Sequence, residues 1–342
     1  MTQRRPTSFD IAALAGVSQP TVSRALSGNP AVSADTRARV IAAAEQLNYK
    51  VDKNASGLRR QHSRTLALLF FEDPTPDETL INPFYLSMVG SMVRACARHG
   101  YDLLISFQQL SDDWHVDYED SRKADGIILL GYGDYLLHRP RLEHLQSRGT
   151  HFICWGNRRA AEFGAMVGSD NRQGGHDATA HLIGLGRRRI AFVGTATEAY
   201  PEFLDRFTGY CTAHDEAGLA VDPALTVAAG PSEDEGRAAL DELQRRGASF
   251  DAVFATSDLA AIGAMHALQD RGIAIPGEVA VAGFDDLASA RYASPPLTTV
   301  AQDAKAAGAA LVEALIEAIE GEGCARSRTL PVSLTVRASS AG

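Results

Sequence analysis

The sequence predicts two unlike parts: a small all-α head with a helix-turn-helix, and an α/β body of two doubly wound parallel-sheet lobes. Three observations predict this fold class. Short amphipathic segments separated by turns occupy residues 1–50, apolar runs alternate with helical segments through residues 65–342, and the charge changes sign between these parts. A chain of 342 residues with 45% hydrophobic content is long enough for two or three buried cores.

Charge is distributed unevenly along the chain. Residues 1–64 contain ten Lys or Arg and four Asp or Glu, a formal charge of +6. The other 278 residues contain 23 basic and 38 acidic side chains, a formal charge of −15. A basic head on an acidic body is typical of a polyanion-binding module attached to another function, although a basic tail without a partner has the same composition.

Several classes of protein do not fit the composition and motifs. The sequence contains no apolar run of about 18 residues and no apolar signal region at its start, so we expect no membrane contact and a cytoplasmic location. No P-loop, GxSxG or HExxH is present, and no complete GxGxxG follows a strand, so we expect no enzyme and no cofactor. The scattered cysteines are typical of a reduced core rather than a metal site; they are Cys96, Cys154, Cys211 and Cys324.

Three short helices are expected in the head. The first follows Ser8 as its N-cap and ends at Gly16. The second occupies SQPTVSRALSG, residues 18–28, and the third starts after Ser33 and runs through Leu47. Two short helices around a glycine turn form a helix-turn-helix, whose second helix enters the major groove of DNA.

The polar start of the second helix raises two alternatives, because short polar side chains can cap a helix or contact bases. We favour base contact. The amide of Gln19 can pair with adenine, and Arg24 can reach guanine or a phosphate. Thr21 and Ser23 are expected on phosphates, and Pro20 offers only an apolar contact.

The stretch FDIAALAGVSQPTVSRALSGNPAVSADTRARVIAAAEQLNY resembles the head of the lactose-repressor (LacI) family of bacterial transcription regulators. Within about 40 residues it carries AGVS-x-x-TVSR-x-L, then VS-x-x-TR-x-x-V, then LNY, a specific combination. The resemblance implies sequence-specific binding to double-stranded DNA. The DNA contacts expected in the head are Thr7, Ser8, Ser18, Gln19, Pro20, Thr21, Ser23, Arg24, Ser33 and Tyr49.

Residues 51–64, VDKNASGLRRQHSR, are polar and basic, which is typical of a linker. The resemblance implies a hinge helix in which Ala55 and Leu58 contact DNA, with paired leucines of two subunits inserted into the minor groove. Gly57 costs about 1 kcal/mol of helix propensity relative to Ala, so we expect this helix only on DNA. The chain has Val51-Asp52 where the family often has Pro-Asn.

The body contains apolar runs suited to buried parallel strands, at residues 66–71, 102–107, 126–130, 151–155, 189–194, 252–255 and 279–284. We expect a lobe boundary near residues 155–168 and a return crossing near residues 297–300. The resemblance extends through VGSDNRQGG, HLIGLGRRRIAFVG, FATSDLAAIGAM, VAVAGFDDLASARY and PPLTTVAQD. It implies a body similar to periplasmic binding proteins.

An effector site is expected where strands end, in the cleft between the lobes. Arg206 in DRFTGY matches a family position that reaches the effector, and Asp285 follows the run VAVAGF. A guanidinium and a carboxylate together can hold vicinal hydroxyls by paired hydrogen bonds. Asp258 follows another strand and starts a helix, so it is either an N-cap or an effector contact.

Aromatic side chains near strand ends are further candidates for the effector site. Phe84, Tyr85 and Trp155 would stack on a sugar face, or else belong to the core. Gln108, at the end of the second apolar run, is a weaker candidate.

The sequence therefore predicts a homodimeric repressor of carbohydrate-utilisation genes that binds a pseudo-palindromic operator and responds to a sugar-like effector. The chain stops shortly after its last strand without a heptad helix, so we expect dimers rather than tetramers. A nucleobase or other non-sugar effector or corepressor is the alternative within this class. A solute-binding transport component would need a signal peptide and no basic head, and a nicotinamide oxidoreductase would need a glycine fingerprint, which LALLFFEDPTPDE lacks.

Overall fold

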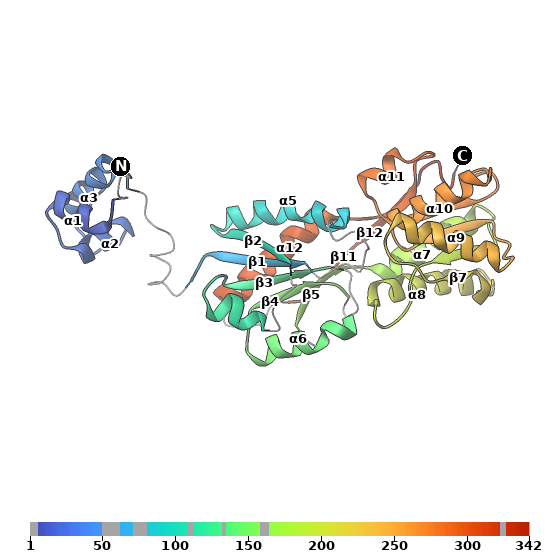
Figure 1. Cartoon of the computed structure of the whole chain (residues 1–342), viewed down its shortest axis with the longest axis horizontal. Helices are drawn as coiled ribbons and strands as arrows, with labels where there is room; N and C mark the ends of the chain where they lie inside the picture. The colour runs from blue at the N-terminus through green and yellow to red at the C-terminus, as the bar shows by residue number, and fades with distance from the viewer. Residues whose placement is uncertain are drawn as a thin grey trace. The chain divides into compact units, whose positions relative to one another are not determined.

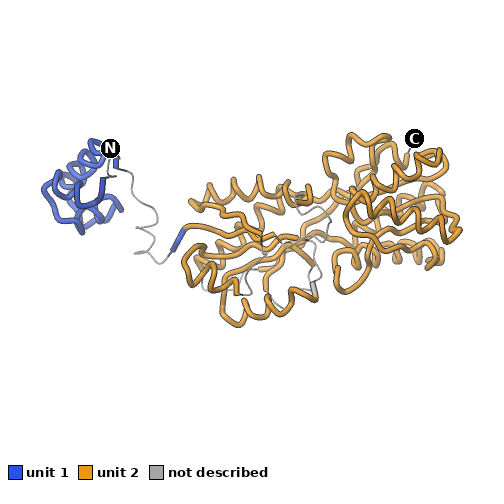
Figure 2. Tube along the Cα trace, viewed as in Figure 1, with its two compact units in different colours: residues 1–63 blue, residues 64–342 orange. Residues whose placement is uncertain are grey.

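The computed structural model divides the chain into two compact units, residues 1–63 and 64–342 (Figure 2). Within the described residues, no helix combines the length and apolar character needed to span a bilayer. The expected contact residues Ala55, Leu58 and Gln108 lie outside the described residues. The structure describes residues 6–49, 62–70, 81–107, 113–131, 135–157, 164–321 and 326–341.

The head is a bundle of three helices (Figure 1), namely α1 (Ser8–Ala15), α2 (Gln19–Leu26) and α3 (Ala34–Gln46). Its core is built by Ile11 of α1, Val22 of α2 and Val40 of α3, which are fully buried. Gly16 ends α1 with a left-handed backbone, φ +65°, which turns the chain directly into α2. The predicted helix-turn-helix is therefore confirmed.

The expected N-cap of α1 is wrong by one residue. Thr7, not Ser8, occupies the cap position, and Ser8 is the first residue of the helix. The carboxylate of Asp10 accepts hydrogen bonds from both the N–H and the hydroxyl of Thr7, each at 2.7 Å. Asp10 thus fixes the start of the helix one residue earlier than its sequence pattern indicated.

The first lobe of the body is built on a parallel sheet of strand order β11-β5-β4-β3-β1-β2 (Figure 1). One face packs against α5 (Pro83–Arg98) and α12 (Ala304–Glu320). The other face packs against a π-helix (His115–Asp120) and α6 (Tyr135–Ser147). The strands are β1 (Thr65–Phe70), β2 (Asp102–Phe107), β3 (Gly126–Leu130), β4 (Phe152–Trp155), β5 (Ala165–Ser169) and β11 (Arg328–Leu330).

The second lobe has a sheet of order β12-β10-β9-β8-β6-β7, parallel except that β12 runs antiparallel to β10. Its strands are β6 (Ile190–Val193), β7 (Thr226–Val227), β8 (Ala252–Ala255), β9 (Ala280–Asp285), β10 (Thr298–Gln302) and β12 (Val332–Thr335). One face packs against α7 and α8, the other against α9 and α10. The helices are α7 (Asn171–Gly184), α8 (Pro201–Glu216), a 3-10 turn (Pro223–Leu225), α9 (Glu233–Arg245), α10 (Asp258–Asp270) and α11 (Ala288–Tyr292).

In the described segments, the chain crosses between the lobes three times, at Asp170, Asp303 and Pro331. The expected boundary at residues 155–168 is wrong, because β5 still belongs to the first sheet. The expected return crossing at residues 297–300 lies within β10. Both strands were missed for the same reason: AMVGS and TTVAQ carry Gly, Ser, Thr or Gln where a buried strand usually carries an apolar run.

Strand β2 also differs from the expectation of a buried strand. Within the part of the chain that the structure describes, it forms one edge of the first sheet and pairs only with β1. Ile105 and Phe107 are 45% and 47% exposed as a result.

Two glycines allow α7 and α8 to touch along their backbones. A Cβ atom at Gly175 of α7 would lie 2.1 Å from the carbonyl oxygen of Arg206 in α8. A Cβ at Gly209 of α8 would lie 2.1 Å from the carbonyl oxygen of Arg172. Only residues without a side chain fit this contact, which sets the position of Arg206 in the fold.

We predict that Gly175→Ala lowers the free energy of unfolding by about 1–3 kcal/mol, because the added methyl group meets backbone that cannot rotate away. Gly184→Ala at the end of the same helix is the matched control, since a Cβ there meets nothing within 4 Å. We expect the control to be neutral or up to about 1 kcal/mol stabilising. Urea unfolding of both variants checks this, and equal stability of the two would contradict the contact.

Candidate functional site

The start of α2 carries the residues that are expected to contact DNA. Ser18 caps this helix, because its Oγ accepts a hydrogen bond from the N–H of Thr21 at 3.4 Å and lies 2.8 Å from the Thr21 hydroxyl. Capping is therefore part of what this polar cluster does. Pro20 and Arg24 are exposed, whereas Thr21 and Ser23 are half-buried.

Gln19 and Ser8 come together across the turn between α1 and α2. The amide Nε2 of Gln19 donates to the hydroxyl of Ser8 at 3.2 Å, which orients a long side chain before any DNA is bound. Elsewhere in the head, Ser33 caps α3 by accepting from the N–H of Thr36, and Tyr49 packs against the head core. DNA contact by these residues and by Thr7 stays a prediction.

Arg206 is the centre of the candidate effector site in the body. Its side chain is almost fully buried, with 1% of its surface exposed. Its Nε donates to Oδ1 of Asn171 at 2.8 Å, and its Nη1 donates to the carbonyl oxygen of Thr256. The guanidinium carbon lies 3.7 Å from the centre of the Phe284 ring. A buried cation is thus held by two hydrogen bonds and an aromatic face.

Asp285 ends β9 beside this guanidinium. Its Oδ1 accepts a hydrogen bond from Nε2 of Gln302 at 2.6 Å, while its Oδ2 is buried without a hydrogen-bond partner. Burial raises the pKa of Asp285 to about 7, although the positive charge of Arg206 acts to lower it. The backbone is left-handed at Asp285 and Asp286, with φ +121° and +55°. Such conformations in residues other than glycine cluster at functional sites.

Asp258 holds the local structure together rather than capping α10. Ser257 is the N-cap, because its Oγ accepts from the N–H of Ala260 at 3.1 Å. The carboxylate of Asp258 accepts from the N–H of Leu287 at 2.7 Å and from the hydroxyl of Thr299. Burial, followed by the nearby carboxyl of Asp285, raises its pKa well above the ordinary range. Of the two alternatives for Asp258, the N-cap is therefore wrong.

Among the described residues, three buried polar atoms at the carboxyl ends of strands lie without a hydrogen-bond partner. They are Oδ2 of Asp285 at the end of β9, Oγ1 of Thr256 just after β8 and Oγ of Ser169 at the end of β5. Buried polar groups in folded proteins almost always have partners. The carboxyl ends of three strands therefore present hydrogen-bonding atoms with remaining capacity, as a hydroxyl-rich ligand requires.

A polar contact joins the two lobes next to Arg206. Asn157, which follows β4, donates from Nδ2 to the carbonyl oxygen of Pro201 at 3.1 Å and to the carboxylate of Asp205. A Cβ at Gly156 would lie 3.1 Å from the carboxylate of Glu202. Burial raises the pKa of Glu202, which favours its uncharged form. The first turn of α8 thus meets the first lobe through polar side chains.

The aromatic candidates are buried in the core of the first lobe. Phe84 lies with its ring centre 5.6 Å from that of Tyr85 and 5.7 Å from that of Trp155. Phe203 and Leu287 of the second lobe belong to the same apolar cluster. These aromatic side chains therefore tie the lobes together, and their contact with an effector stays a prediction.

Several residues of this site were not predicted from the sequence. Asn171 follows β5 and Gln302 is the last residue of β10, two strands whose polar composition concealed them. The rule that ligands meet strand ends would have found both residues once those strands were recognised. Thr256 contributes a carbonyl oxygen, which no sequence pattern shows.

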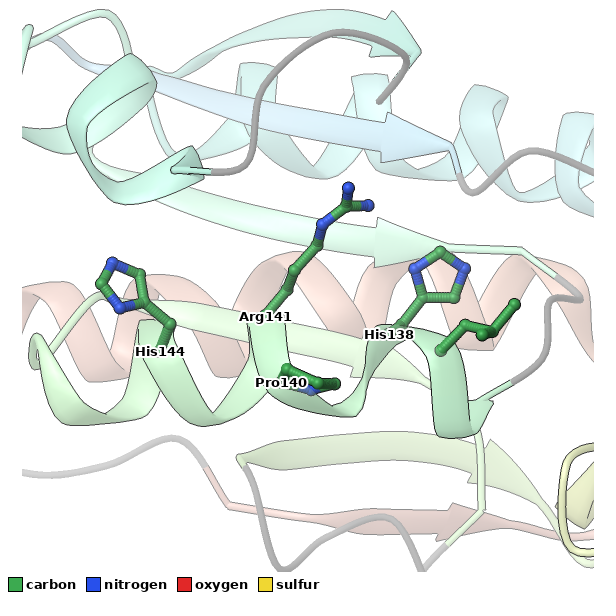
Figure 3. Close-up of a pocket in the computed structure, with 5 residues that line it drawn as sticks. His138, Pro140, Arg141 and His144 are labelled. Carbon is green, nitrogen blue, oxygen red and sulfur yellow. The ribbon is translucent and has the colours of Figure 1, made fainter.

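A separate hollow is found on the first lobe. It is lined by side chains of α6, of which His138, Arg141 and His144 project from the same side of the helix (Figure 3). Arg141 stacks 5.3 Å from the centre of the Trp114 ring, and Nε2 of His144 lies 3.4 Å from a carboxylate oxygen of Asp113. We do not assign the effector to this exposed helix face.

No group of three or more His, Cys, Asp or Glu side chains among the described residues is arranged to hold a metal ion. Cys96 and Cys154 are buried free thiols, Cys211 is a half-buried one, and Cys324 lies outside the described residues.

Comparisons with known families match both parts of the chain. Residues 9–52 match the family described as bacterial regulatory proteins, lacI family. Residues 179–340 match the periplasmic binding protein-like domain. Among curated proteins, the HTH-type transcriptional regulator CelR of Thermobifida fusca is 33% identical over 326 residues, covering 94% of each chain.

Two solved structures resemble this chain over nearly its whole length. A complex of the transcriptional regulator CelR with cellobiose has a TM-score of 0.73 and 31% identity, covering 98% of this chain and 100% of the other. A lac repressor dimer bound to operator and an anti-inducer has a TM-score of 0.82, covering 98% of this chain and 99% of the other. At 22% identity, the second likeness shows the fold alone.

We predict that Gln19→Ala relaxes base preference at one position of each half-site, because the amide can no longer pair with a base edge. The cost at the preferred base is about 1–3 kcal/mol. Selection from a randomised DNA pool with wild type and variant measures this. A uniform loss of affinity across all sequences would instead place Gln19 on a phosphate.

We predict a pH effect at Asp285. Its carboxyl ionises near pH 3.8 in the unfolded chain and near pH 7 in the folded chain, so the folded chain binds more protons between these values. Rising pH therefore favours unfolding over this range. Relative to Asp285→Asn, the wild-type free energy of unfolding should fall from about pH 4 to pH 7, by on the order of 2 kcal/mol or more.

Urea unfolding of both proteins across this pH range gives the difference directly. A difference that stays constant with pH would mean that Asp285 ionises normally in the folded protein.

Proposed function

This chain belongs to the lacI family of bacterial regulatory proteins, and we propose that it represses carbohydrate-utilisation genes under the control of a small sugar. It is a DNA-binding transcriptional regulator with a helix-turn-helix head and a periplasmic-binding-protein-like body. In our proposal, the effector binds at the carboxyl ends of β5, β8 and β9. The contacts are made by Arg206 and Asp285, with Asn171 and Gln302 holding these two side chains in place.

One observation carries this proposal: a buried guanidinium and a buried carboxyl, each fixed by a partner amide, lie beside strand ends. Oδ2 of Asp285 retains hydrogen-bonding capacity there, as does the hydroxyl of Thr256. Vicinal hydroxyls of a sugar match such paired donors and acceptors. The structure of CelR with cellobiose supports the choice of a sugar, because that regulator has the same fold and 31% identity with this chain.

Control of DNA binding follows from a difference in effector affinity between two arrangements of the lobes. The coupling free energy between two such sites is commonly about 1–3 kcal/mol. In our proposal, the sugar favours the arrangement in which the hinge segments of the two subunits separate, and Leu58 leaves the minor groove. A homodimer is required for paired hinges, and a pseudo-palindromic operator follows from its two-fold symmetry.

We further propose that the protein acts in the cytoplasm, where its DNA is, and that it catalyses no reaction. The members of the family it matches are regulators rather than enzymes.

The test is a thermal-shift screen of the purified protein against neutral sugars, including cellobiose, phosphorylated sugars and purines. A ligand at a hundred times its Kd adds about 2.7 kcal/mol of stability, which is readily measured. We expect a sugar to raise the melting temperature. A shift by a purine with none by any sugar would overturn the sugar assignment and leave the DNA-binding function standing.

Two variants locate the site once a ligand shifts the wild type. Arg206→Lys keeps the charge but loses the planar donors, so we expect the shift to disappear. Arg172→Lys is the matched control, because Arg172 lies exposed on the neighbouring helix. Loss of the shift in both variants, or in neither, would remove Arg206 from the proposed contacts.

A further inference from the structure

Helix α12 connects the candidate effector site with the first residue of the body unit. Gln302, which holds Asp285, is followed directly by Asp303, and Asp303 caps α12 by accepting from the N–H of Ala306 at 2.8 Å. The helix then runs through the first lobe to Glu320. Its 17 residues span about 25 Å at the usual rise of an α-helix.

Glu320 meets Arg64, which is the residue where the linker from the head enters the body. One carboxylate oxygen of Glu320 lies 2.9 Å from Nη1 of Arg64. The guanidinium carbon of Arg64 also lies 5.0 Å from the centre of the Tyr101 ring. Helix α12 therefore begins beside the candidate effector site and ends at Arg64, where the linker enters the body.

The backbone of Arg64 is held as firmly as its side chain. Its N–H donates to a carboxylate oxygen of Asp125 at 2.9 Å, and its carbonyl oxygen accepts from the N–H of Asp102 at 2.8 Å. Its φ is +53°, a left-handed value that costs energy for any residue with a side chain. A strained conformation persists only where the surrounding contacts impose it. The contacts of Arg64 therefore fix the direction in which the chain enters β1.

The helix is packed as a rigid element between these two ends. A Cβ at Gly308 would lie 2.6 Å from the carbonyl oxygen of Met88 in α5, so the two helices touch along their backbones. The hydroxyl of Ser91 in α5 also donates to the carbonyl oxygen of Lys305. Leu311 and Leu315 of α12 are fully buried against the sheet. Helix α12 is therefore held as one packed element between Asp303 and Glu320.

A helix C-terminus carries a partial negative charge, and Glu320 adds a full one. Arg64 compensates the charge of Glu320 at this end of α12, as Arg328 compensates that of Glu317 in the same last turn. The pair thus gains from the helix as well as from its own contact, although both side chains are about half exposed.

We propose that α12 transmits the effector state from Gln302 to the linker, and that Glu320 and Arg64 are the positioning residues that pass it on. The inference rests on the proposed function, since it assumes that the site beside Gln302 controls operator binding. It adds a route and two residues that contact neither the effector nor the bases.

The first test compares operator affinities of Glu320→Arg and Glu143→Arg in the full-length protein. Glu143 forms an ion pair with Arg139 at 3.0 Å on α6, exposed to a similar degree, so it is a matched control. The probe is the duplex that the wild type selects from a randomised pool. We expect Glu320→Arg to weaken binding about fivefold or more and the control to stay within twofold of wild type.

Melting temperatures of both variants separate positioning from stability, and Glu320→Gln repeats the test without a new charge. We expect the two charge-reversed variants to melt within a few degrees of each other. If Glu320→Arg and Glu320→Gln both bind the duplex as the control does, the inference is overturned.

The second test is a double-mutant cycle between the two ends of the helix. Independent substitutions at such a separation multiply their effects on binding to within a factor of about two. If α12 links the sites, Gln302→Ala combined with Glu320→Arg should depart from the product of the single effects by more than twofold. Agreement with the product within twofold would contradict transmission through α12.

The cycle needs no knowledge of the effector, so its outcome is distinct from that of the sugar screen. If the wild type selects a sequence but the cycle is multiplicative, only this inference fails. If the wild type selects no sequence at all, the proposed function fails, and this inference fails with it.

Discussion

The burial of the Arg206 guanidinium is the constraint on which the body of this protein depends. A buried charge is costly unless its donors are satisfied and its field is compensated. The amide of Asn171 and the carbonyl oxygen of Thr256 satisfy two of its donors, and the Phe284 ring covers its face. Removing any one of these partners would leave a buried cation incompletely satisfied. Arg206 therefore holds together the carboxyl ends of β5, β8 and β9.

Asp285, beside Arg206, is neither fully ionised nor fully hydrogen-bonded. Burial works against its ionisation, while Arg206 and Gln302 favour it, and the resulting pKa of about 7 leaves the carboxyl balanced between two forms. One of its oxygens is already bound to Gln302, and the other keeps its capacity. A buried carboxyl with a strongly shifted pKa and an unpartnered oxygen is typical of functional sites, which is why Asp285 is a candidate.

The sequence predicted the fold class, the helix-turn-helix and most strands, because each has a local pattern. Gly16 ends α1 and Ser33 directly precedes α3, as their positions indicated. The sequence could not show that β5 and β10 are strands, since AMVGS and TTVAQ lack the apolar run of a buried strand. Resemblance indicates Arg206 and the strand-end rule indicates Asp285, and the structure buries both side chains near each other; their contact with an effector stays a prediction. The partners Asn171 and Gln302 belong to segments 131 residues apart, and only the folded chain brings them to one place.

Coupling between the effector and the operator is measured directly by titrating operator DNA, followed by fluorescence anisotropy, with and without the sugar that stabilises the protein. We expect saturating sugar to change the operator affinity by about tenfold, within the roughly 5- to 150-fold range of typical allosteric coupling. A sugar that binds and stabilises the protein while leaving the operator affinity unchanged would contradict it. Arg206 and Asp285 would then form a binding site without control over DNA.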